Sequence, residues 1–148
     1  MKTQLHATLL LLLFSSFTVL AESNINTTFF GNLAVEGFDT VAYFTENKPV
    51  EGSKKYQTTW QGANWRFSSQ TNLDLFKQDP SKYAPQYGGY CAYAVSKNKT
   101  ASIEPELFVI HNDKLYLSYS KSVSKKFKAD RDGYIQKAET NWPNLREK

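Results

Sequence analysis

The sequence predicts an α+β fold, in which a small antiparallel sheet of two hairpins packs with short helices and a C-terminal helical segment follows. Residues 56–68 and 107–119 each alternate large apolar and polar side chains around a turn, which is typical of a hairpin with one buried face. Residues 69–83 and 122–141 instead carry apolar side chains at helical spacing. The length of 148 residues, 41% of them hydrophobic, suffices for one domain with its own core.

The N-terminal residues have the pattern of a secretory signal peptide. Lys2 precedes the apolar run Leu9–Phe14, and the small residue Ala21 suits a cleavage site. We therefore expect a signal peptide at 1–21, a polar lead-in at 22–28 and a folded domain at 29–145. The apolar run is well short of the roughly 20 residues that span a bilayer, so we expect no stable membrane insertion after cleavage. The mature protein is predicted to be periplasmic or secreted.

The two hairpins have recognisable turns. In the first, Gly62-Ala63-Asn64 separates Trp60 from Trp65, and we expect both indoles in the core. In the second, Asn112-Asp113 joins a strand at 107–111 to a strand that begins at Lys114. A two-residue Asn-Asp connection suits a tight turn, so this hairpin is predicted with its turn placed.

The helices are predicted from their first residues. Asp39 is placed to cap a short helical turn, Ser69 to cap a helix, and Pro80 to begin a second short one. The segment around Gly88-Gly89 is predicted to be a tight turn that leads into a short helix, with Gly89–Val95 as the candidate range. Residues 122–141 are predicted to form one or two amphipathic helices, interrupted near Gly133 and ending at Trp142-Pro143.

The net charge of +4 is only mildly basic. The densest basic stretch, Lys121, Lys125, Lys126, Lys128 and Arg131, is diluted by two Asp residues and lies at helical spacing. A solvated helix face explains it, and no nucleic-acid partner is predicted.

Few soft metal ligands follow the predicted cleavage site, because residues 22–148 contain Cys91, His111 and no Met. A single Cys cannot form an internal disulfide. Cys91 is therefore buried and inert, paired with another chain, or chemically used. We expect burial, because its neighbours are apolar or amphipathic and the Gly88-Gly89 pair allows backbones to approach closely.

Three stretches resemble the YHS domain family, in particular a single-domain secreted branch. They are Gly37-Phe-Asp-Thr-Val-Ala-Tyr-Phe, then Trp65-Arg-Phe-Ser-Ser with Asn72, Phe76 and Asp79-Pro-Ser-Lys-Tyr, and finally Tyr87-Gly-Gly-Tyr-Cys-Ala-Tyr-Ala-Val. The resemblance covers about residues 29–145 and implies a small α+β domain built on a short antiparallel sheet.

Relatives attached to heavy-metal transporters carry Asp-Pro-Val-Cys and Phe-Cys-Ser-x-x-Cys, whose thiolates suit soft metal ions. This sequence departs from them at each thiolate. Alignment places Ala42 at the first Cys and Ser68 and Asn72 at the other two. The family's metal site is therefore not carried over residue by residue.

Two hypotheses for function follow. In the first, the chain is a secreted, non-enzymatic module that handles copper or another transition-metal ion, with Cys91 and His111 as ligands and a carboxylate or a partner chain completing the site. In the second, the chain binds a small molecule or a periplasmic protein without metal, in a pocket with apolar walls and polar tips. That pocket would be lined by Tyr43, Trp65, Tyr87, Tyr90 and Tyr93.

An enzyme is not expected. No Ser lies in a Gly-x-Ser-x-Gly frame, and Glu104 and Glu106 flank Pro105 in a predicted loop that would splay them apart. A reactive Cys91–His111 pair would need the fold to bring the two side chains within about 3–4 Å.

Overall fold

A computed structural model describes residues 24–148, and the predicted signal peptide at 1–21 lies outside the described residues. In chain order the elements are η1 (Val35–Gly37), α1 (Thr40–Thr45), β1 (Ser53–Trp60), β2 (Ala63–Phe67), α2 (Gln70–Gln78), α3 (Pro80–Tyr83), η2 (Gln86–Gly89), α4 (Ala92–Ser96), β3 (Glu104–His111), β4 (Lys114–Ser118), α5 (Lys121–Ala129) and α6 (Arg131–Leu145).

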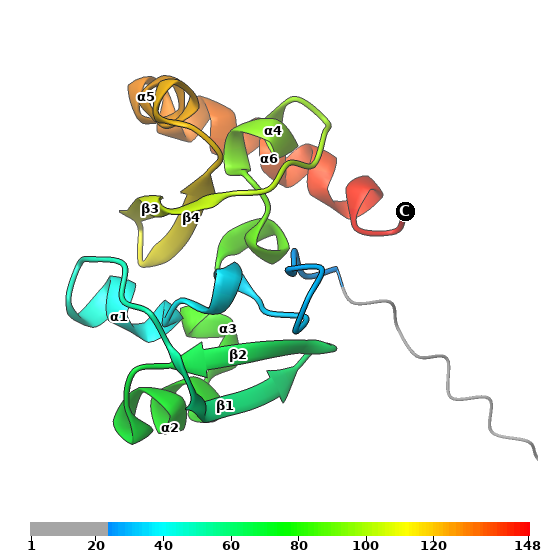
Figure 1. Cartoon of the computed structure of the whole chain (residues 1–148). Helices are drawn as coiled ribbons and strands as arrows, with labels where there is room; N and C mark the ends of the chain where they lie inside the picture. The colour runs from blue at the N-terminus through cyan, green and yellow to red at the C-terminus, as the bar shows by residue number, and fades with distance from the viewer. Residues whose placement is uncertain (1–23) are drawn as a thin grey trace, which may run out of the picture.

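The predicted α+β class and both hairpins are confirmed. β1 pairs with β2 and β3 with β4, each pair antiparallel, and they form two separate two-stranded sheets. Figure 1 shows the first sheet with α1, α2 and α3 in one half of the molecule, and the second sheet with α4, α5 and α6 in the other. None of the helices in this part of the chain is both long and apolar enough to cross a bilayer.

The turn of the second hairpin is confirmed, whereas that of the first was predicted one residue too late. Asn112 and Asp113 both have positive φ and join β3 to β4. In the first hairpin the turn residues are Gln61 and Gly62, also both at positive φ, and Ala63 already belongs to β2. Two left-handed residues give the connection that matches the twist of the flanking strands, and a third turn residue is not needed.

Four predicted boundaries were wrong, one of them the end of the C-terminal helix, which continues through Pro143 to Leu145. Gly89 belongs to η2, and α4 begins at Ala92 with Cys91 as its N-cap. β3 begins at Glu104, because a bulge between Glu104 and Phe108 lets the strand extend through Pro105. The C-terminal helices break at Asp130 rather than near Gly133, since the Asp130 carboxylate caps α6 by accepting a bond from the Gly133 N–H.

Strand β4 is buried on both faces and joins two hydrophobic clusters. Leu115 and Leu117 belong to the cluster that contains Trp65, Phe67 and Phe76. Tyr116, which points to the opposite face, belongs to the cluster formed with Tyr87, Ala92, Val95, Val109, Phe127 and Ala138. The lysines of α5 and Arg131 are exposed, so the predicted solvated basic face is confirmed.

The first described residues pack on the glycine turn of η2. The Asn26 N–H donates to the Gly88 carbonyl at 2.8 Å, and the Asn26 amide donates to the Gly89 carbonyl at 3.2 Å. A Cβ on Gly88 would collide with the Asn24 carbonyl oxygen, and Gly88 has φ +62°. The close approach that the glycine pair was predicted to allow is therefore made by residues 24–26.

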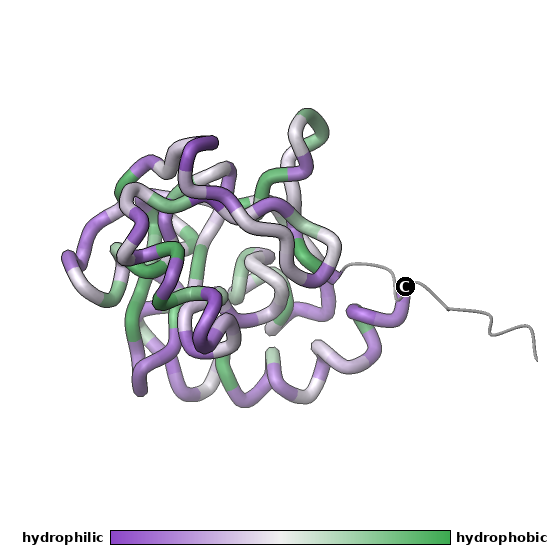
Figure 2. The backbone as a smooth tube through the Cα atoms, turned by 90° about the horizontal axis from the view of Figure 1, so that it is seen from below, coloured by the Kyte–Doolittle hydropathy of each residue, from purple (hydrophilic) through white to green (hydrophobic). Residues whose placement is uncertain are grey.

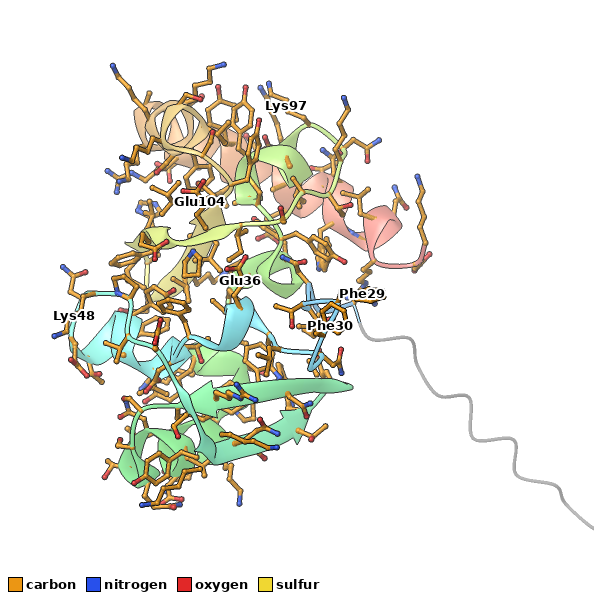
Figure 3. All side chains as sticks on the ribbon, in the orientation of Figure 1. Phe29, Phe30, Glu36, Lys48, Lys97 and Glu104 are labelled. Atoms are coloured by element: carbon orange, nitrogen blue, oxygen red, sulfur yellow. The ribbon has the colours of Figure 1, made fainter. Side chains whose placement is uncertain are left out.

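A loop closed by the Thr27–Ala34 bridge projects from the body with a hydrophobic tip, as Figure 2 shows. Its tip residues Phe29 and Phe30 are 94% and 84% exposed, and both lie near the first described residues (Figure 3). Asn64 on β2 donates its side-chain N–H to the Gly31 carbonyl at 2.9 Å, which holds the loop against the first hairpin.

Replacing Gly88 with Ala should destabilise the protein well beyond the cost of a left-handed alanine. Gly31→Ala is the matched control, because Gly31 has φ +79° but a Cβ there meets only ordinary contacts with Leu33. We expect Gly31→Ala to cost about 1 kcal/mol and Gly88→Ala at least about 2 kcal/mol more, measured by urea unfolding. Equal losses would show that residues 24–26 do not pack on the turn.

Candidate functional site

The carboxylate of Asp39 is fully buried and accepts five hydrogen bonds. Its Oδ1 accepts from the backbone N–H groups of Val41 and Ala42 at 2.9 and 3.1 Å, which confirms the predicted cap of α1. Its Oδ2 accepts from the Ser68 N–H at 2.8 Å, the Ser68 hydroxyl at 2.7 Å and the Asn72 side-chain N–H at 2.7 Å. All five partners are donors, so they match the ionised carboxylate, which can only accept. We call Asp39, Ser68 and Asn72 the Asp39 hub.

Cys91 is buried, as predicted, and lies in the first hydrophobic cluster. Its backbone N–H donates to the Ala101 carbonyl at 3.0 Å, and its carbonyl accepts from the Val95 N–H at 3.1 Å. Cys91 also forms an isolated parallel bridge with Leu117 of β4. The thiol therefore lies inside the packing between α4 and the second hairpin.

His111 lies elsewhere, at the end of β3. It pairs with Lys114, which is three residues along β4 from Leu117, a span of about 10 Å at the rise of a strand. The His111 Nε2 lies 2.9 Å from the Asp132 Oδ1, at the first turn of α6. The two proposed metal ligands are thus not brought together. Within residues 24–148, no three His, Cys, Asp or Glu side chains gather in an arrangement that could hold a metal ion.

The predicted aromatic pocket is divided by the fold. Tyr43 and Trp65 are in the first cluster, where the Tyr43 hydroxyl donates to the Pro105 carbonyl at 2.8 Å and the Trp65 indole N–H to the Trp60 carbonyl at 3.0 Å. Burial, followed by the nearby Glu106, raises the pKa of the Tyr43 phenol above its usual range. Tyr93 packs against Tyr134 of α6 with ring centroids 5.0 Å apart. These three residues pack in the fold rather than line one pocket.

Tyr87 and Tyr90 do lie together, because both rings contact Trp142 from α6. Their ring centroids are 6.0 and 6.2 Å from that of Trp142. The end of α6 is fixed by Asn141, whose side chain donates to the Val95 and Ser96 carbonyls at 3.0 and 3.2 Å. This anchor places the Trp142 indole beside the two tyrosines.

Trp142 borders two surface hollows, of about 620 and 440 Å³, that share Asn24, Trp142 and Arg146 among their lining residues. We call the two together the Trp142 cleft. The larger hollow is lined by Asn24, Ile25, Trp60, Gln61, Ser81, Ala84, Pro85, Gln86, Tyr87, Gly88, Trp142 and Arg146. The smaller is lined by Asn24, Tyr90, Thr100, Trp142, Leu145, Arg146 and Lys148.

The Tyr87 side chain is a rigid wall of this cleft. Tyr87 has φ +56°, the first of three consecutive left-handed residues, and its side chain is buried. Its hydroxyl donates to the Glu139 carboxylate at 3.1 Å. Burial, followed by the charge of Glu139, raises the pKa of Tyr87 far above its usual range, so the phenol stays protonated and keeps this bond at physiological pH.

Residues 41–87 match the family model of the YHS domain. This segment of the chain is similar to the YHS domain. The match includes Ala42, Ser68 and Asn72 and ends at Tyr87, so the YHS segment supplies most of the Asp39 hub and one wall of the Trp142 cleft. No curated protein and no solved structure matches the chain.

The residues at the aligned thiolate positions do not fit a soft metal ion. The hub brings the Ser68 and Asn72 side chains onto the same carboxylate oxygen, and the Ala42 N–H bonds the other oxygen. The three positions that the sequence alignment assigned to thiolates are therefore neighbours in the structure. A hydroxyl, an amide and a methyl stand where thiolates would bind a soft metal ion. The Asp39 carboxylate already accepts five hydrogen bonds, so its oxygens are fully used without a cation.

Glu104 and Glu106 lie in strand β3 rather than in a loop, so the prediction that their side chains splay apart was wrong. Residues two apart on a strand share a face, so Glu104 and Glu106 point the same way. Burial, followed by repulsion from Glu106 and Glu104, raises the pKa of Glu36 in η1, which lies toward β3 (Figure 3). Among residues 24–148, none of these three carboxylates forms an ion pair within 4 Å.

Sequence reasoning missed Trp142, Arg146 and Trp60 as site residues. The cleft joins segments around residues 24, 60, 81–88 and 142–146, and no local spacing links them. The hub was partly visible, because Asp39 was predicted as a cap, and Ser68 and Asn72 stood out as departures from one family pattern. The signal that could have identified the hub is the combination of Asp39 with two polar residues, Ser68 and Asn72, at aligned thiolate positions.

Replacing Asp39 with Asn should destabilise the fold by about 2–4 kcal/mol, because one amide N–H₂ would face N–H and O–H donors in a buried place. Asp113→Asn is the matched control, since Asp113 is exposed in a turn at positive φ, which Asn tolerates. It should change stability by less than about 0.5 kcal/mol. Urea unfolding measures both, and similar values for the two variants would show that the hub is not structural.

Cys91 should react slowly with a thiol reagent in the native protein and quickly in denaturant. Cys91→Ser should cost about 1–3 kcal/mol, because it places a hydroxyl in an apolar site, and Cys91→Ala should cost less than Cys91→Ser. Rapid stoichiometric labelling without denaturant would contradict the burial and make Cys91 a functional thiol.

Proposed function

We propose that this chain is a secreted or periplasmic, single-domain and non-enzymatic binding module, and that it binds a small organic molecule in the Trp142 cleft. The observation that carries the proposal is the indole of Trp142, which contacts the rings of both Tyr87 and Tyr90 and lines a hollow of about 620 Å³. Sites for small molecules have volumes of roughly 300–1,000 Å³ and are rich in aromatic walls with a few polar groups. The signal pattern that ends at Ala21 supports the location outside the cytoplasm.

The geometry favours this hypothesis over metal handling. Metal handling by Cys91 and His111 would need the two side chains on one ion, and the fold places them at different ends of the second hairpin. The family positions that would otherwise supply thiolates are engaged in the Asp39 hub. The cleft is thus the better-supported binding site.

The same distances support a role without catalysis. A thiol nucleophile needs a base within hydrogen-bond reach, whereas the imidazole of His111 is bonded to Asp132 and Cys91 is enclosed by α4 and β4. The cleft itself is lined by amide, hydroxyl, aromatic and cationic groups, without a carboxylate or imidazole among its lining side chains in residues 24–148. Such a set can bind and orient, which fits a binding module.

A substitution that fills the cleft tests the proposal. Ser81 is exposed and lines the larger hollow, so Ser81→Trp should block it without removing core packing. Thr71→Trp on the exposed face of α2, outside the cleft, is the matched control. Ligand-observed NMR with indole and 3-phenylpropanamide should show binding to the wild type and to Thr71→Trp, and its loss in Ser81→Trp.

Two outcomes would overturn the proposal. If both probes bind Ser81→Trp as they bind the wild type, the ligand site is elsewhere. If neither probe binds the wild type at millimolar concentration while calorimetry with Zn²⁺ or Cu⁺ gives a tight 1:1 site, the metal hypothesis is correct and the ligand set must be sought again.

A further inference from the structure

The charged side chains of the Trp142 cleft all have one sign. Arg146 lines both hollows and Lys148 lines the smaller one, whereas no Asp or Glu side chain of residues 24–148 lines either. Glu139, whose carboxylate accepts the Tyr87 hydroxyl, and Glu147, which follows Arg146 in the chain, both lie outside the lining. These two cations favour an anionic group on the ligand over a cationic one.

Arg146 has no ion-pair partner within the described chain. Its backbone N–H donates to the Trp142 carbonyl at 3.0 Å, so the residue follows the last turn of α6 and its side chain is exposed. A cation at a helix C-terminus is favourable by itself, because it faces the negative end of the helix dipole. That role requires only a positive charge, whereas ligand recognition would also use the planar guanidinium.

On the basis of the proposed function, we propose that the ligand of the Trp142 cleft is a small carboxylate with an aromatic body. The guanidinium of Arg146 can donate two parallel hydrogen bonds to a carboxylate. The body of the ligand would lie in the larger hollow against Trp142 and Trp60, since offset or edge-to-face aromatic contacts are favourable there. Asn24 and Gln86 supply uncharged polar groups along the same wall.

Three probes that differ only in charge test the inference, namely 3-phenylpropanoate, 3-phenylpropanamide and 3-phenylpropylammonium. Titrations by ligand-observed NMR should give the order carboxylate, amide, ammonium, with the carboxylate about tenfold tighter than the amide. Added NaCl should weaken binding of the carboxylate and leave the amide unchanged.

Variants of α6 separate ligand recognition from general charge. Arg146→Gln should weaken the carboxylate about tenfold and the amide by less than about twofold, and Arg146→Lys should give an intermediate loss because the forked geometry is missing. Arg131→Gln is the control, since Arg131 is an exposed cation at the other end of α6 and lines neither hollow.

The outcomes distinguish this inference from the function on which it rests. Equal affinity for all three probes, with loss of all three in Ser81→Trp, would overturn the charge preference and leave the cleft as the binding site. An equal effect of Arg131→Gln and Arg146→Gln would assign the preference to net charge and would overturn the role of Arg146. Absence of binding by every probe would overturn both proposals.

Discussion

The buried charge of Asp39 is the constraint on which the first half of the fold depends. A carboxylate without exposed surface loses its hydration, and the loss must be offset by bonds that it accepts within the protein. Five donors do so, two from α1, two from Ser68 and one from α2, and they constrain the chain. The first helix must begin at Thr40, the residue after β2 must lie beside the carboxylate, and the first turn of α2 must direct Asn72 toward it. The same saturation leaves no electron pair directed at a cation. The hydrogen bonds of Asp39 therefore hold this half of the fold together. They also occupy the positions at which the relatives attached to heavy-metal transporters carry thiolates.

Strand β4 performs the corresponding task between the two halves. A strand normally buries one face, but Leu115 and Leu117 point into one hydrophobic cluster while Tyr116 points into the other. The hydroxyl of Tyr43 adds a bond from α1 to the carbonyl of Pro105 at the start of β3. Each sheet is too small to be stable alone, and the residues of β4 join the second sheet to both clusters.

The sequence predicted hairpins and helix caps, which depend on neighbouring residues, but missed side-chain contacts between distant segments. Period-two alternation and the Asn112-Asp113 turn located the hairpins, and the cap at Asp39 was correct, because side-chain periodicity and capping are local. The aromatic-rich stretch around Tyr87 was identified as unusual, but its partner Trp142 lies 55 residues away and was treated as the end of a helix. Tyr43 illustrates the converse error, since an aromatic side chain with a polar tip suits both a pocket wall and a core position with one buried hydrogen bond. Only the fold decides between these two.

The residues that line the Trp142 cleft come partly from the segment that matches the YHS domain and partly from outside it. The match ends at Tyr87, so the matched segment provides Trp60, Ser81 and Tyr87, while α6 and its C-cap, which lie beyond the match, provide Trp142 and Arg146. Asn141 fixes α6 through the carbonyls at the end of α4, and Gly88 fixes residues 24–26 along the rim. The groups that would select a ligand thus come from segments that flank the domain. A chain with the same matched segment but a different C-terminal helix would keep Trp60, Ser81 and Tyr87 and change the selectivity that we propose, because the residues proposed to contact the ligand are not part of the Asp39 hub.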